Sequence, residues 1–216
     1  MKEVKTLDEA LIDLISKANP DGVKSALEKG ADPAAKTRNG SVYALEFAKH
    51  NLDELRNTLA VKDDTGVMAA AERAETIIVM IQEALDNELN KVAAGGMEDV
   101  ARAGKLVEAG ADLNARDAGG ISVLEHAIMM ANALTVAELI NNRGARVTEK
   151  TAEFAGECKK LLSDKTEHRG WILNFITRNV ETGGNQGRKV RVVKENALGT
   201  NANGNDGRKP GPTLKS

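Results

Sequence analysis

The sequence predicts an all-α protein built from stacked helical hairpins, and three observations lead to this fold class. Apolar residues recur at steps of three and four along the chain as far as Arg178, as they do on the buried face of a helix. Aromatic residues make up only 2% of the sequence, so a core must consist of Leu, Ile, Val, Ala and Met, which suits closely packed helices. The third observation is a phrase that occurs twice.

Residues 28–40 read EKGADPAAKTRNG, and residues 108–120 read EAGADLNARDAGG. The two phrases share Glu, Gly-Ala-Asp and a final turn glycine, and Lys36 is matched by Arg116, 80 positions later (116 − 36). Gly30 and Gly110 stand where a helix ends in the left-handed region, which glycine enters without a steric penalty. A unit of two short helices cannot bury both of its faces alone, so the repetition predicts that neighbouring units stack.

Local signals place the elements of the first half in order. Thr6 and Glu9 have capping-box spacing and predict a helix start, and Asn19-Pro20 ends this helix and begins the next, which stops at Gly30. After the first phrase we expect one helix from Tyr43 and a second one through Leu59. Beyond a break at 62–66, the longest helix is predicted from residue 67 to about residue 92, with a stop at the two glycines 95–96.

The second half follows the same plan. A helix over residues 100–107 leads to the second phrase, Ser122 and Glu125 form another capping box, and two helices follow as far as Gly144. A last helical pair is predicted at 151–162 and 169–178. From residue 180 the chain is rich in Gly, Asn, Lys and Arg and offers little to bury, which predicts a disordered basic tail. The predicted organisation is a helical repeat domain at 1–179 and a tail at 180–216.

The order helix, turn, helix, Gly-Ala-Asp, polar hairpin, helix resembles the ankyrin repeat family. The second copy matches best, through Gly110-Ala111-Asp112, Asn114-Ala115 and Gly119-Gly120. The helix start that the family writes as Thr-Pro-Leu-His reads here as Tyr43-Ala44-Leu45-Glu46 and as Ser122-Val123-Leu124-Glu125. The likeness covers residues 7–60 and 88–155, and the middle only by analogy. It implies an ankyrin-like solenoid of about four degenerate repeats with an elongated middle element.

This resemblance implies a non-catalytic protein–protein interaction module or scaffold. Partners of ankyrin arrays bind to the hairpin tips and first helices on the concave face. Carried onto the matching positions, the expected partner-binding residues are Lys36, Thr37, Arg38, Asn39, Glu46, Lys49, Arg116, Asp117, Ala118, Glu125 and Met129. Two alternatives remain open at this point: an enzyme with a cleft in the divergent middle segment, and a bacterial secreted effector whose basic tail is a secretion or partner-binding signal.

Other function classes have little support in the sequence. A net charge of −2 and a pI near 6.0 give no basic footprint for nucleic acid. Cys158 is the only cysteine, which excludes an intrachain disulfide and a cysteine-based zinc cluster. The three histidines are widely separated and His126 is read as a packing or surface residue, so we expect no metal, cofactor or catalytic residue. Without a signal peptide or an apolar span, the chain is expected to be soluble and cytoplasmic, unless it is exported as an effector.

Overall fold

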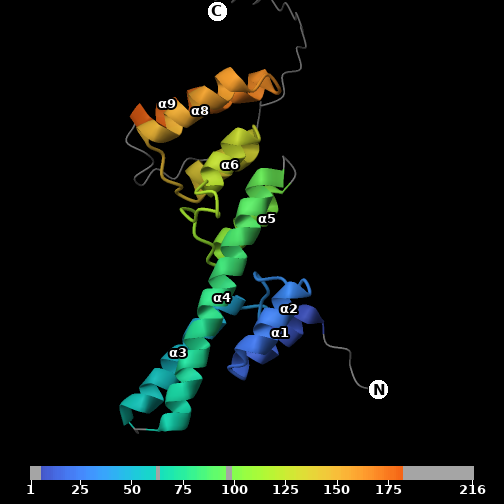
Figure 1. Cartoon of the computed structure of the whole chain (residues 1–216), viewed down its shortest axis with the longest axis vertical. Coiled ribbons are helices and arrows are strands. Elements are labelled where there is room, and N and C mark those ends of the chain that lie inside the picture. The colour runs from blue at the N-terminus through green and yellow to red at the C-terminus, as the bar shows by residue number, and fades with distance from the viewer. Residues whose placement is uncertain (1–5, 62–63, 96–98, 182–216) are drawn as a thin grey trace, which may run out of the picture.

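The structure, a computed structural model, describes residues 6–61, 64–95 and 99–181, and these form the helical array in Figure 1. The helices are α1 (Leu7–Ser16), α2 (Pro20–Glu28), α3 (Ala44–Val61), α4 (Thr65–Gly95), α5 (Val100–Glu108), α6 (Val123–Met129), α7 (Ala133–Ala137), the π-helical turn η1 (Glu138–Asn142), α8 (Glu149–Leu161) and α9 (Thr166–Glu181). Within these ranges the only β-type pairings are two isolated bridges in the hairpins. The predicted all-α class is confirmed.

The predicted helix starts and stops are present in the structure. Thr6 Oγ1 accepts a hydrogen bond from the Glu9 amide, and Ser122 Oγ accepts one from the Glu125 amide, which confirms both capping boxes. Asn19 caps α2 through its side chain. The two phrase glycines have φ values of +95° at Gly30 and +106° at Gly110. Each therefore ends its helix in the conformation that a residue with a Cβ disfavours.

The structure builds the same three-helix unit twice. In the first unit, Asp8 on α1 accepts a hydrogen bond from the Asp32 amide at 2.8 Å, and α1 packs against α3. In the second, Asp86 on α4 accepts from the Asp112 amide at 2.7 Å, and α4 packs against α6. The C-terminal half of α4 therefore takes the place that α1 has in the first unit, with α5 in the place of α2.

Helix α4 is thus shared between two helical pairs. Its N-terminal half lies along α3. Its C-terminal half packs against α5 and continues past the start of α3, so that this single helix spans much of the long axis (Figure 1). This explains why the middle of the sequence matched the repeat pattern poorly. The expected break between Tyr43 and Leu59 was wrong: α3 is one helix, because residues 44–61 contain neither Gly nor Pro to end it.

An ion-pair cluster joins the two units. Asp32 follows α2, and its carboxylate accepts two hydrogen bonds from the Arg102 guanidinium, at 2.9 and 3.0 Å, and one from Lys105 Nζ at 2.7 Å. Partial burial acts to raise the pKa of Asp32, but the donors from Arg102, Lys105 and the Ala34 amide outweigh it and lower this pKa from 3.8 to about 2. The first phrase is therefore tied to α5 by a carboxylate that stays ionised.

The main core runs through the array from α1 to α9. Its fully buried large side chains include Leu11, Leu45, Ile77, Ile81, Leu85, Leu89, Leu106, Ile128, Leu139, Ile172 and Ile176. A smaller cluster around Leu52, Ala71 and Ala74 holds the outer part of the α3–α4 hairpin together. This hairpin extends away from the rest of the array at one end of the molecule (Figure 1). Its stability rests on much less apolar burial than that of the main array.

The last helical pair, predicted at 151–162 and 169–178, is confirmed as α8 and α9. Arg169 on α9 is 3% exposed and donates to the Ile128 and Met129 carbonyls at the end of α6, at 3.3 and 2.9 Å. It thereby supplies a donor to the Met129 carbonyl and a second donor to the Ile128 carbonyl, which also accepts from the Ala131 amide at 3.0 Å. The predicted tail lies outside the described residues, apart from Val180 and Glu181 in α9.

Candidate functional site

A groove of about 360 Å³ lies between α1, the start of α3 and the first hairpin, which we define as residues 29–43. Its lining residues are Glu9, Ile12, Asp13, Ser16, Lys36, Arg38 and Phe47. Two of them, Lys36 and Arg38, are among the residues that the sequence predicted for partner binding. The groove is therefore the place where the predicted tip residues meet a concave surface.

The floor of the groove is apolar. Ile12 from α1 and Phe47 from α3 are partly buried and pack against the main core, so one side of each is fixed while the other faces the groove. The packing of α1 against α3 brings these two side chains together although they are 35 positions apart (47 − 12). A fixed apolar floor is the part of a binding site that gains most from removing a ligand's apolar surface from water.

The two walls carry opposite charges. Glu9 and Asp13 are four residues apart and so lie on one face of α1. Lys36 lies at the bridge of the first hairpin and Arg38 in its turn, and both side chains line the groove. Part of the acidic wall is already engaged, since Glu9 completes the capping box and Asp13 pairs with Lys17 at 2.8 Å. The groove thus presents an acidic edge and a basic edge on either side of an apolar strip.

The first hairpin holds its own shape. The Thr37 amide donates to the Val42 carbonyl at 2.8 Å, and Asn39 Oδ1 accepts hydrogen bonds from Thr37 Oγ1 and from the amide and hydroxyl of Ser41. Lys36 Nζ lies 4.4 Å from the centre of the Tyr43 ring, within cation–π range. Because the backbone of the hairpin is ordered by these contacts, less conformational entropy is lost when a ligand contacts its charged side chains.

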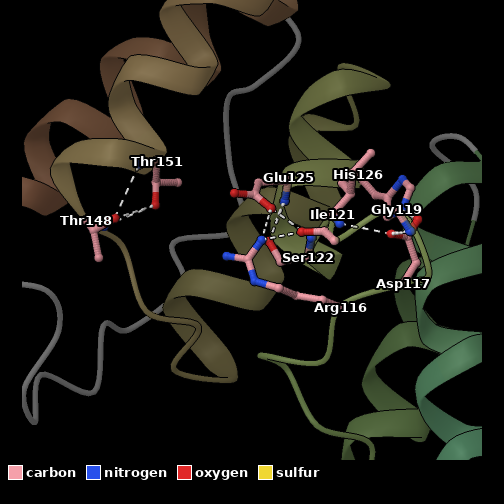
Figure 2. A network of polar contacts seen from close by, with 10 residues as sticks. Arg116, Asp117, Gly119, Ile121, Ser122, Glu125, His126, Thr148 and Thr151 are labelled. Carbon is pink, nitrogen blue, oxygen red and sulfur yellow. Dashed lines mark hydrogen bonds and ion pairs between the residues drawn. The ribbon is translucent and has the colours of Figure 1, made fainter.

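The second hairpin, residues 109–122, directs its polar side chains at itself (Figure 2). Arg116 donates to the Gly120 carbonyl and pairs with Glu125 at 3.1 Å. One oxygen of Asp117 accepts the amides of Gly119 and Ile121, both at 2.9 Å, and the other lies 2.8 Å from His126 Nε2. These side chains shape the loop.

The surroundings of this second network favour the charged forms of its two carboxylates, Asp117 and Glu125. Hydrogen bonds from the Ile121 amide and from the His126 ring lower the pKa of Asp117. Burial acts to raise the pKa of Glu125, but hydrogen bonds from Ser122 and the positive charge of Arg116 lower it overall. Both carboxylates are therefore ionised acceptors at neutral pH.

The structure separates the predicted partner-binding residues into three groups. Lys36 and Arg38 line the groove, whereas Thr37 and Asn39 build the turn behind it. The others lie elsewhere: Glu46 and Lys49 are exposed on α3 outside the lining, Ala118 is exposed at the second tip, Met129 is half-buried, and Arg116, Asp117 and Glu125 belong to the network of Figure 2.

Sequence reasoning missed five residues of the groove, namely Glu9, Ile12, Asp13, Ser16 and Phe47. The four from α1 form one face at helical spacing, but in the sequence this pattern indicates only the first helix. Nothing local connects them with Phe47 or the hairpin. Only the packing of α1 against α3 reveals the shared surface.

The one cysteine of the sequence has a packing role in the structure. Cys158 is buried in α8, and burial raises the pKa of its thiol, so a reactive thiolate is disfavoured there. The described residues contain no group of three or more His, Cys, Asp or Glu side chains placed to hold a metal ion. In the middle segment, where the sequence left an enzymatic cleft open, a hollow lies between α1, α3 and α4. Its titratable lining residues are Lys17, Glu54 and Arg73.

No protein-family model matches the chain, and no curated protein sequence matches it significantly. Among the helices of the described residues, none has the length and apolar character needed to cross a membrane.

Proposed function

We propose that the chain is a non-catalytic interaction module that holds an extended segment of a partner protein in the groove between α1, the first hairpin and α3. The observation that carries this proposal is the composition of the groove. An apolar floor of Ile12 and Phe47 lies between an acidic edge on α1 and a basic edge on the hairpin. Such a surface can bury an apolar side chain and pair charges of both signs beside it.

The repeated unit supports an ankyrin-like interpretation of this surface. Each unit has a helical pair, Gly-Ala-Asp, a hairpin with one isolated bridge, and the first helix of the next unit. The resemblance implies that partners bind between hairpin tips and first helices. Helices α1 and α3 each stand first in their pair, so the groove lies on the surface where the resemblance expects a partner.

The shape of the groove suggests the chemistry of the bound segment. A volume of about 360 Å³ is at the lower end of small-molecule pockets and suits one or two side chains of a peptide. We expect an apolar residue over Ile12 and Phe47. In an extended segment the residues two positions before and after it point to the same side as it does, so a basic residue at one of these positions would approach Glu9 and an acidic residue at the other would approach Arg38.

A selection from a phage-displayed library of short random peptides tests this proposal. The parent chain is compared with Arg38→Glu, which reverses the basic edge, and with Lys24→Glu, a matched charge reversal at an exposed position of α2 outside the groove. The parent and the Lys24 variant should enrich the same peptides, and the Arg38 variant should lose them at unchanged helicity. Enrichment that is equal in all three proteins would contradict the proposal.

A further inference from the structure

The last helix of the array exposes aromatic surface. Trp171 on α9 is 45% exposed and stacks on Phe175, with ring centres 4.8 Å apart and planes at 10°. The sequence contains one Trp, one Tyr and three Phe, so two of its five aromatic residues (1 + 1 + 3) meet on this helix. The terminal element of a stacked array is expected to present a polar outer face. Helix α9, with α8 at one end of the molecule, does not follow this expectation (Figure 1).

Charges frame the aromatic pair on the same face. The residues Glu167, Trp171, Asn174 and Arg178 are exposed and follow one another at steps of four, three and four, so they form one stripe along α9. An acid stands toward the N-terminal end of this stripe and a base toward its C-terminal end. A stripe with this order is complementary to an antiparallel copy of itself.

We propose that this face binds a second copy of the chain, with the two α9 helices packed antiparallel about a two-fold axis between Trp171 and Asn174. In that arrangement two residues of the stripe lie at the same level along the axis and face each other when their numbers have the same sum, and 171 + 174 equals 167 + 178. Glu167 of one copy then faces Arg178 of the other, twice over by symmetry.

The size of the surface sets the expected strength. One stripe of about three turns buries less than the roughly 1,200 Å² of a standard stable interface, so the dimer is expected to be weak, with a dissociation constant on the order of 100 μM. Self-association should therefore appear only as the concentration of the chain rises.

Sedimentation equilibrium of the full chain over a range of concentrations tests the proposal through the charge pairs. Glu167→Arg and Arg178→Glu should each weaken the dimer about tenfold, since each replaces two attractive pairs by two repulsive ones. The double variant should restore association, because it exchanges the two partners. A matched reversal at the exposed Glu72 of α4, far from α9, should have no effect.

The design separates the proposal from a general effect of charge or folding. Trp171→Ala should abolish association, and circular dichroism checks that each variant stays helical. A parent chain that remains monomeric at every concentration would overturn the proposal. A monomeric chain is also the result expected if a different partner covers this face. A double charge variant that associates no better than either single variant would also overturn it.

Discussion

Replacing Asp32 with Asn should destabilise the protein by about 2 kcal/mol at neutral pH. The side chain is 21% exposed and bridges the first phrase to α5 through Arg102 and Lys105. Its pKa of about 2, against 3.8 for the ordinary carboxyl, corresponds to roughly two units at 1.36 kcal/mol each. Asn keeps an acceptor oxygen but loses the charge, so it should lose most of this stabilisation.

The stabilisation that the Asp32 carboxylate contributes should decrease as the pH falls. The pKa is lowered on folding, so the stabilisation is complete above about pH 4 and is lost as the pH falls through the folded pKa near 2. The difference in unfolding free energy between the parent and Asp32→Asn should therefore fall to about half near pH 3. Urea unfolding at a series of pH values measures this difference, and taking the difference removes the contributions of the other carboxylates.

Asp112→Asn is the matched control, since this equivalent residue in the second phrase is exposed and, among the described residues, its carboxylate accepts from Asn114 alone. Its effect should stay within about 0.5 kcal/mol. If Asp32→Asn destabilises no more than Asp112→Asn, or by the same amount at pH 3 as at pH 7, the reasoning about the ion-pair cluster is refuted.

Three further predictions concern packing. Gly110→Ala should destabilise the protein by about 1 kcal/mol more than Gly30→Ala, as measured by urea unfolding. Both glycines have a positive φ, but only at Gly110 would an added Cβ meet Leu45, at 2.7 Å. Equal losses of stability in the two variants would contradict this. Arg169→Met should lower stability by about 2 kcal/mol by removing the donor to the Met129 carbonyl, whereas the Ile128 carbonyl keeps the Ala131 amide, and a loss under about 1 kcal/mol would show that water replaces the guanidinium. Cys158 should react with a disulfide reagent slowly in the native chain and quickly in urea, and fast native reaction would contradict its burial.

The helix boundaries could be predicted where the signal is local. Thr6 with Glu9 and Ser122 with Glu125 form their capping boxes within four residues, and Gly30 and Gly110 end their helices through their own backbone freedom. The continuous α3 was missed because the expected break came from the analogy with a repeat and had no breaking residue to support it. The sharing of α4 between two pairs depends on long-range packing, which no local pattern encodes.

The two hairpins look equivalent in sequence and differ in the structure for a specific reason. The first has one more residue between its turn glycine and the next helix, so Lys36 pairs across its bridge with Tyr43, whereas Arg116 pairs with Ser122. Arg116 consequently reaches Glu125 at the helix start, and Lys36 lies over the Tyr43 ring. The sequence showed the extra residue but not its consequence for the side chains.

The most direct test of the proposed groove is a hydrogen-exchange footprint of the full chain with a peptide selected by the parent. Peptide binding should slow the exchange of amides in residues 9–16 and 36–47, which border the groove, and leave residues 116–126 of the second hairpin unchanged. Slower exchange at the second hairpin, without any change in α1 and the first hairpin, would contradict the account.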